Sequence, residues 1–295
     1  METFERIDEL RTRLDGCRAR GRSVALVPTM GYLHAGHRSL VRRAAGECDD
    51  VVVSIFVNPL QFAAGEDLES YPRDPEGDRA AIEAEGGTVV FAPTVDEMYP
   101  QGQSAVATTV SVDALASVME GASRPTHFAG VCTVVSKLFN IVGPCRSYFG
   151  EKDYQQLAII RRMASDLSFP VQVVGCATGR EPDGLAMSSR NVYLTEEERR
   201  VAPVLQQALR AGASAIRDGE TDADRVRALM ASLIDTEPLG ALDYVEVADA
   251  ETLQPLARAT VDARLFGAVR FGRARLIDNI SAGDTSAGDM ADGTS

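Results

Sequence analysis

Two of the three histidines in this chain stand three residues apart, in a setting that suits phosphate chemistry. His34 and His37 follow a β-rich run at residues 24–28 and a turn that contains Gly31. At this spacing both imidazoles can lie on one face of a helix that begins here, where backbone N–H groups and the helix dipole attract phosphate. Gly36 leaves room for the ligand, and we interpret the pair as hydrogen-bond donors to a leaving pyrophosphate. The alternatives are two surface histidines or a metal pair, and the lack of a nearby Cys or third His in the sequence disfavours the metal.

Two amide side chains, Asn58 and Gln61, come directly after an apolar run at residues 51–57. A run that is apolar on both faces is typical of a parallel strand covered by helices. Such a strand would deliver both amides to its carboxyl end, where neutral groups can hydrogen-bond to a small polar substrate. Because Asn-Pro also commonly starts a turn, a plain loop is the alternative.

A lysine follows another short strand, predicted at residues 147–149 and ended by Gly150. Lys152 is a mobile point charge that can meet a phosphate. Asp153 precedes the next predicted helix, so it can cap that helix or accept a hydrogen bond from a ribose hydroxyl. A helix-capping turn without a ligand is the alternative.

A further motif, residues 184–191, places two hydroxyls beside an arginine. Ser188, Ser189 and the forked guanidinium of Arg190 suit phosphate oxygens. The segment lies where the composition of the chain changes, so it can serve as a mobile loop that closes over a nucleotide. The alternative is a hydrophilic hinge.

These motifs must be positioned by elements that alternate along the first part of the chain. The apolar patterns predict strands at residues 24–28, 51–57, 88–92, 147–149 and 171–175, and helices at 37–45, 78–85, 131–142 and 154–167. The opening segment is predicted to be helical because Phe4, Ile7, Leu10 and Leu14 recur at a helical period. This alternation implies βαβ units, so we predict an α/β fold with a Rossmann-like, doubly wound, mostly parallel sheet. Ligands bind such sheets at the carboxyl ends of the strands, where the first three motifs fall.

The texture of the sequence changes near residue 183, which indicates a second domain. The patterns predict helices at 195–218 and 222–235, and strands at 242–247, 263–271 and 274–278. We therefore predict a Rossmann-like domain at 1–180 and a small α+β lid domain at 181–280. The last residues, 281–295, contain almost nothing apolar and cannot offset the entropy of ordering, so we predict a disordered tail there.

The bulk composition limits the partners of this chain. The formal net charge is −13, which argues against nucleic-acid or anionic-membrane partners because their phosphates would be repelled at long range. Any anion site must therefore be local. The longest apolar runs are too short to span a bilayer. Five dispersed cysteines and a charged, amphipathic start without a signal sequence favour a cytoplasmic protein with reduced thiols.

Taken as a set, the motifs resemble those of one family. The segments PTMGYLHAGH, SIFVNPLQF, YPR, RPTHFAGV, YFGEKDYQQL and DGLAMSSRN are similar to those of pantothenate synthetases (pantoate–β-alanine ligases), within the HxGH nucleotidyltransferase superfamily. The resemblance runs from about residue 24 to residue 191 and continues more loosely through the C-terminal strands. It implies that pantoate and β-alanine are joined with ATP and Mg²⁺ through a pantoyl-adenylate, with release of pyrophosphate and AMP, in a homodimer.

The resemblance also implies roles for single residues, although it assigns none to Mg²⁺. His37 is the expected proton donor, with His34, Lys152 and Arg190 as its companions at the triphosphate. Substrate contacts are expected at Gln61, Gln156, Asn58 and Tyr71. The ATP segments implied by the match are Met30, Gly31, Tyr32, Leu33, His34, Ala35, Gly36, His37, Gly150, Glu151, Lys152, Asp153, Gly179, Met187, Ser188, Ser189 and Arg190.

One departure from the family pattern concerns the adenine. Gly179 stands where the family commonly has valine, so its backbone groups would read the base without a side chain to pack near it. Two other functions compete with the ligase. A nucleotidyltransferase that makes a stable nucleotide conjugate shares the histidine motif but does not explain Asn58 together with Gln61. A non-catalytic nucleotide-binding relative does not explain why every charged group that the chemistry needs is present.

Overall fold

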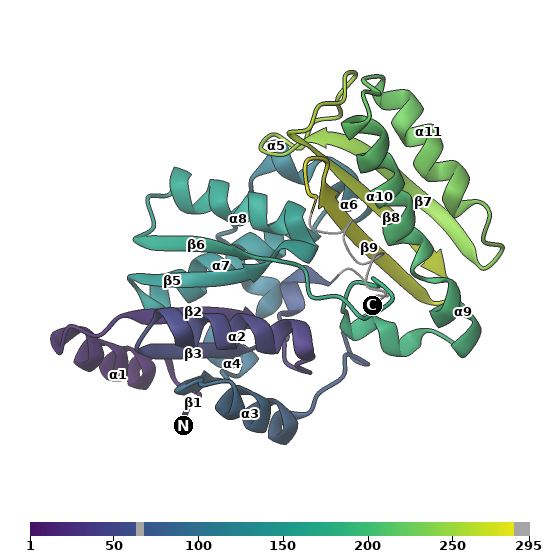
Figure 1. Ribbon diagram of the computed structural model, residues 1–295. Helices are drawn as coiled ribbons and strands as arrows, with labels where there is room; N and C mark the ends of the chain where they lie inside the picture. Colours follow the sequence, from purple (N-terminus) through teal and green to yellow (C-terminus); the bar gives the residue numbers. More distant parts are fainter. Residues whose placement is uncertain (63–67, 286–295) are drawn as a thin grey trace, which may run out of the picture. The chain divides into compact units, whose positions relative to one another are not determined.

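The first unit of the molecule, Met1–Gly179, is built around six parallel strands (Figure 1). The computed structural model describes residues 1–62 and 68–285 of the chain. In spatial order the strands are β1 (Glu2–Phe4), β4 (Val89–Phe91), β3 (Asp50–Ile55), β2 (Val24–Thr29), β5 (Cys145–Gly150) and β6 (Val171–Cys176). The predicted α/β fold with a mostly parallel, doubly wound sheet is confirmed.

Helices cover both faces of this sheet (Figure 1). On one face, α2 (Ala35–Glu47) and α3 (Pro75–Ala84) pack aliphatic side chains against β2, β3 and β4. The crossover from β5 to β6 runs in the opposite direction along the sheet, so its right-handed turn places α8 (Tyr154–Asp166) on the other face. There α7 (His127–Val142) contacts both α8 and α1 (Ile7–Ala19). The shorter helices are η1 (Pro59–Gln61), α4 (Val95–Met98), η2 (Gln103–Ala105), α5 (Asp113–Ala116), α6 (Met119–Ser123) and η3 (Glu151–Asp153).

Pro28 ends the pairing between β2 and β5 before their carboxyl ends. β2 pairs with β3 as far as Thr29, but its pairing with β5 ends at Leu26 and Ser147. The Thr29 carbonyl faces the β3 side, where it accepts from the Phe56 N–H, so the nitrogen of Pro28 faces β5. Proline has no N–H to donate, and the ladder therefore stops. The strand order also reverses between β2 and β5, which makes this edge the switch point where ligands bind such sheets.

The second unit, Arg180–Ser295, has helices packed on an antiparallel sheet. The sheet order is β7 (Gly240–Asp249), β8 (Ala263–Phe271) and β9 (Ala274–Ser281). Its helices are η4 (Ser189–Tyr193), α9 (Glu196–Val201), α10 (Val204–Arg217) and α11 (Ala223–Ile234). The single helix predicted at 195–218 is thus two helices. Pro203 immediately precedes α10, and a proline inside a continuous helix would remove a hydrogen bond and clash with the preceding turn.

Two further differences from the sequence predictions lie at the chain ends. The segment around Phe4 is not helical but forms β1, which pairs with β4, and the helix begins only at Ile7. The tail predicted from residue 281 starts too early, since Ser281 belongs to β9 and Ala282 is buried. Residues 286–295 of that predicted tail lie outside the described residues.

Two properties concern the redox state of the cysteines and the possibility of a membrane-spanning helix. All five cysteines are free. Within residues 1–62 and 68–285, no helix combines the length and the apolar character needed to cross a membrane.

Candidate functional site

The turn after β2 takes a left-handed path that a buried carboxylate holds. Gly31 has φ +82° and Tyr32 φ +53°, both in the region that favours glycine. The Asp78 carboxylate on α3 accepts hydrogen bonds from the N–H groups of Tyr32 (2.8 Å) and Leu33 (2.6 Å). A Cβ at Gly31 would lie 2.8 Å from Asp78 Oδ2 and 3.0 Å from Ile55, so only glycine fits. Two N–H groups of the predicted ATP loop are therefore engaged within the protein.

His34 and His37 meet at the start of α2, as their spacing predicts. Their ring centroids are 4.0 Å apart. The Gly36 N–H donates to His34 Nδ1 (3.1 Å), and the His34 N–H donates to His37 Nδ1 (3.4 Å), which together cap the helix. Since Nδ1 accepts in both rings, the proton of each neutral imidazole resides on Nε2 and makes that atom a donor.

The electrostatic setting keeps both imidazoles neutral near pH 7. Burial, followed by the charge of Lys152, lowers the pKa of His34 to about 4. Burial likewise lowers the pKa of His37 to about 3, with His34 as the next cause. Asp153 acts in the opposite direction on both rings. The segment after β5 therefore lies within electrostatic reach of the histidine pair.

That segment carries a lysine and an open glycine. The Lys152 ammonium lies 3.4 Å from an Asp153 carboxylate oxygen, and its side chain is only 18% exposed. Apart from the two chain neighbours of Gly150, no described residue has an atom within 4 Å of a Cβ built there, so a ligand can approach the backbone. Glu151 is directed elsewhere, because a carboxylate oxygen lies 3.1 Å from the position of a Cβ at Gly175 on β6.

The two amides predicted after β3 contact each other. Asn58 Nδ2 donates to Gln61 Oε1 (3.2 Å), and Gln61 Nε2 donates to the sulfur of Met30 (3.0 Å), on the turn after β2. Asn58 is 1% exposed. Its Oδ1 accepts from the Tyr99 hydroxyl (2.8 Å), and its Nδ2 also donates to the Gly130 carbonyl (3.1 Å). This engagement suits a residue that orients Gln61 rather than one that meets substrate itself.

Other groups fix the backbone of Gln61. Its carbonyl accepts from Arg124 Nη2 (3.3 Å) and lies 3.0 Å from His127 Nδ1. A Cβ at Gly130 would lie 2.2 Å from the Leu60 carbonyl, so the close approach of α7 to η1 requires glycine. Hydrogen bonds therefore hold both the main-chain carbonyl and the side-chain amide of Gln61.

The remaining predicted residues are placed as follows. Tyr71 is 7% exposed and packs edge to face on Phe62, at 6.0 Å between centroids. Gln156 lies in the first turn of α8 and is half-buried. Gly179 is the last residue of the first unit. The predicted ATP residues Met187, Ser188, Ser189 and Arg190 belong to the second unit, where Ser188 Oγ accepts from the Arg190 N–H at the start of η4.

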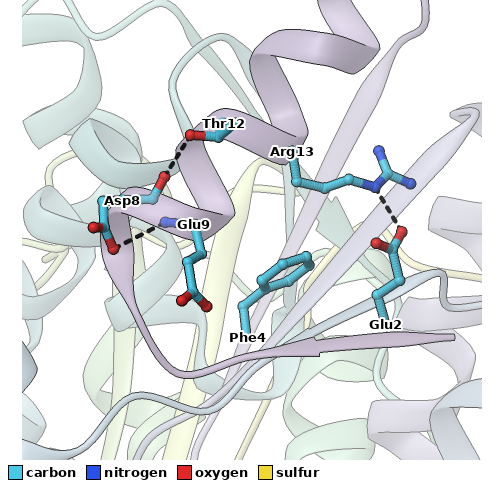
Figure 2. Close-up of a pocket in the computed structure, with 6 residues that line it drawn as sticks. All are labelled: Glu2, Phe4, Asp8, Glu9, Thr12 and Arg13. Atoms are coloured by element: carbon cyan, nitrogen blue, oxygen red, sulfur yellow. Dashed lines mark hydrogen bonds and ion pairs between the residues drawn. The ribbon is translucent and has the colours of Figure 1, made fainter.

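A pocket of about 410 Å³ lies between β1 and α1, and none of the predicted site residues lines it (Figure 2). Its lining includes the carboxylates of Glu2, Asp8 and Glu9. Arg13 also lines it, but its charge is engaged by Glu2 at 2.6 Å. The acidic lining disfavours a polyphosphate, and the pocket is not a candidate for the nucleotide.

Three residues that shape this site, Asp78, Tyr99 and Gly130, were not predicted from the sequence. For Asp78 a signal existed, because it stands four residues before Ile82 and both are buried on one face of α3. An acidic residue on the apolar face of an amphipathic helix requires a partner. Tyr99 and Gly130 lie far from Asn58 in the sequence, and no local pattern links them to it.

The parallel sheet with its switch point and the capped histidine pair together define a Rossmann-like α/β domain with a candidate phosphate site at the carboxyl edge of its sheet. The family model for pantoate-beta-alanine ligase matches residues 2–281. The chain therefore belongs to the pantoate–β-alanine ligase family.

Curated relatives and solved structures agree with this membership. The chain is 53% identical to a pantothenate synthetase of Rhizobium etli, over 96% of this chain and 95% of the relative. It is 57% identical to one of Roseiflexus castenholzii, over 87% and 91%. The structure of Thermus thermophilus pantothenate synthetase matches with a TM-score of 0.89 at 49% identity, covering 96% and 99%. A Francisella tularensis pantoate-beta-alanine ligase, complexed with beta-gamma ATP and beta-alanine, matches with a TM-score of 0.77 at 31% identity, covering 96% and 98%.

Proposed function

We propose that the protein condenses pantoate with β-alanine in an ATP-dependent reaction that passes through a pantoyl-adenylate. The observation that carries the proposal is a meeting of two groups of side chains at the carboxyl edge of the sheet. His34, His37 and Lys152 supply donors and positive charge, while Met30 and Gln61 contact each other on the neighbouring loops. The groups proposed to bind the phosphates therefore lie next to those proposed to bind a small polar acid.

In the first half-reaction a pantoate carboxylate oxygen attacks the α-phosphorus of ATP. The bond from that phosphorus to the bridging oxygen breaks, and pyrophosphate leaves with the electron pair. Both reactants are anions, so the protein must supply positive charge and position. Lys152 and Arg190 are the proposed cations, and Gln61 and Gln156 the proposed contacts to pantoate.

The histidines are neutral hydrogen-bond donors in the free protein, and His37 donates a proton only after bound ATP has stabilised its protonated form. With Nδ1 engaged by backbone N–H groups, each ring offers Nε2–H to the phosphates. His37 is the proposed proton donor to the leaving pyrophosphate, and His34 its phosphate-binding companion. Phosphate charge next to the rings stabilises the protonated form, so we expect their pKa values to rise when ATP binds.

In the second half-reaction the uncharged amine of β-alanine attacks the acyl carbon of the adenylate. The new amide bond forms as AMP leaves with the carboxyl-side oxygen, and the amine releases a proton. We assign no side chain as its base. Gly179 is the proposed backbone contact to adenine, and Met187 to Arg190 the proposed segment at the triphosphate.

Mg²⁺ is part of the proposal as the usual companion of ATP. The described residues hold no group of three or more His, Cys, Asp or Glu side chains that could cage a metal. Mg²⁺ on a nucleotide keeps several waters and uses only one or two carboxylates besides the phosphates, so the residues present fit that mode. Asp153, whose charge acts on both histidines, is the carboxylate that we assign to it, and the bound ion would neutralise phosphate charge.

The deciding experiment measures pyrophosphate and AMP from ATP, Mg²⁺ and pantoate, with and without β-alanine. We expect a stoichiometric burst of pyrophosphate with pantoate alone and steady AMP release once β-alanine is added. A stable nucleotide conjugate without AMP would support the competing nucleotidyltransferase. ATP binding without pyrophosphate release would support the non-catalytic relative.

A variant pair tests the proton donor. We expect His37→Ala to lower the rate of adenylate formation by about 100-fold or more, as for loss of a general acid. Arg38→Ala is the matched control at the next helical position, because Arg38 is 44% exposed and pairs with Glu85. Near-normal pyrophosphate release by a folded His37→Ala protein would remove His37 from the mechanism. We also propose that the protein is a homodimer, because the family that it resembles is usually dimeric. We propose the cytoplasm as its compartment, because its five cysteines are free.

A further inference from the structure

A buried ion pair joins the turn that leads into Met187–Arg190 to β9. Arg180 places Nη1 at 2.6 Å and Nη2 at 3.0 Å from the two oxygens of the Asp278 carboxylate on β9. The Asp278 side chain is 2% exposed and that of Arg180 19%. Asp278 is opposite Gly267 in the ladder between β9 and β8. The ion pair therefore ties the turn to the antiparallel sheet of the second unit.

The same guanidinium also shapes the turn from inside. Arg180 Nη1 donates to the Gly184 carbonyl (3.0 Å), which closes the turn across its base. The backbone of Arg180 forms an antiparallel bridge with Ala186, and the Glu181 N–H donates to the Leu185 carbonyl (2.8 Å). Leu185 and Ala186 are buried. Residues 180–186 thus form a compact hairpin that is organised around one side chain.

The hairpin passes directly into the predicted ATP segment. Asn191 Nδ2 donates to the Ala186 carbonyl (3.1 Å), and so ties the far end of the segment to the last residue of the hairpin. Between these two points, Ser188 Oγ accepts from the Arg190 N–H (3.3 Å). A displacement of the hairpin would therefore move the whole segment, including the Arg190 backbone.

We propose that Arg180 and Asp278 are positioning residues for nucleotide binding, because their ion pair fixes the hairpin that carries the proposed ATP segment, Met187–Arg190. This inference rests on the proposed function of that segment as an ATP contact. Neither member of the pair needs to touch the nucleotide. A bidentate fork carries directional information that a single ammonium lacks, so lysine cannot replace Arg180 in this role.

The test is Arg180→Lys, with the ATP dissociation constant measured by calorimetry and steady-state kinetics measured in parallel. We expect both the dissociation constant and the KM for ATP to rise about tenfold or more, since small displacements of binding groups are costly, while kcat and the KM for pantoate stay within about twofold. Arg199→Gln is the matched control, because it removes an exposed pair with Asp183 in the same hairpin and should change ATP binding less than about twofold. A purely structural role would instead lower the thermal midpoint and leave the balance between the two KM values unchanged.

A second variant keeps the test decisive where Arg180→Lys does not fold. The double variant Arg180→Gln with Asp278→Asn removes both buried charges together, so neither is left uncompensated, and we expect it to fold with the same loss of ATP affinity. A folded variant of either kind that binds ATP as tightly as the parent protein would overturn the proposal, as would an equal rise in the pantoate KM. If the parent protein binds ATP but releases no pyrophosphate with pantoate, the proposed function fails, and the ATP dissociation constants still decide the role of the ion pair.

Discussion

Replacement of Asn58 by alanine offers a quantitative test of how the site is supported. The side chain makes four hydrogen bonds, to the Tyr99 hydroxyl, the Gly130 carbonyl, the Leu60 N–H and Gln61 Oε1. At about 0.5–1.5 kcal/mol net for each bond, the sum is about 2–6 kcal/mol. η1 is half-buried and water can replace some partners there, so we expect a loss of about 2–4 kcal/mol in the unfolding free energy. Because the Gln61 amide loses its orienting donor, the KM for pantoate should rise as well.

The assay must separate the two units, which need not unfold together. Hydrogen-exchange mass spectrometry on peptides that cover β3–η1 and α7 gives the local opening free energy of the first unit. Burial raises the pKa of Tyr99, so its hydroxyl is a donor throughout the accessible pH range. Tyr99→Phe should therefore cost about 1 kcal/mol alone, but nothing further in the Asn58→Ala background, where the hydroxyl has already lost its partner. Additive losses in the double variant would refute this reasoning.

Three further predictions follow from the packing and the titrating groups. The pKa values of His34 and His37 in the folded protein, about 4 and about 3, lie below the ordinary 6.5, so the neutral forms favour the fold. The unfolding free energy should therefore fall as the pH drops from about 6.5 towards 4. The His34→Gln, His37→Gln double variant should show a smaller decrease in thermal midpoint over that range. Gly130→Ala places a Cβ 2.2 Å from the Leu60 carbonyl and should destabilise α7 by about 2–3 kcal/mol and raise the pantoate KM, whereas Ala129→Gly, one position earlier, should leave that KM unchanged. Truncation after Asn279 removes buried Ala282 and its hydrogen bond to Ala263 and should lower the thermal midpoint by several degrees, while truncation after Thr285 should not, and equal midpoints would contradict the role given to the end of β9.

The sequence predicted the central strands β2 and β3 well because each contains a mostly aliphatic run between turn signals. The strand expected at 24–28 is Val24–Thr29, and the strand expected at 51–57 is Asp50–Ile55. β1 escaped prediction because a three-residue edge strand is too short for a pattern, and Phe4 also fits a helical period with Ile7. The break between α9 and α10 had a visible signal in Pro203, which the amphipathic pattern on either side concealed.

The candidate site likewise has residues that a local pattern indicates and residues that no local pattern indicates. His34, His37, Lys152 and Gln61 could be proposed from the sequence because each stands in a short segment whose chemistry is local. Their supports come from distant parts of the chain, and only folding brings them together. The Asp78 carboxylate reaches back 46 residues to Tyr32, and the hydroxyl of Tyr99 reaches 41 residues to Asn58. No single sequence pattern contains such pairs.

The two hydrogen bonds that Asp78 accepts from the turn after β2 affect the association rate of a ligand. Since the N–H groups of Tyr32 and Leu33 already have an acceptor in the protein, the left-handed turn after β2 is complete before any ligand arrives. The conformational entropy lost in that turn then belongs to folding and does not reduce the affinity. A ligand that reaches this turn therefore needs no preceding rearrangement of it, and the turn itself does not reduce the binding-competent fraction. Loss of the carboxylate would transfer the ordering of the turn to the binding step, and slower association would reveal it.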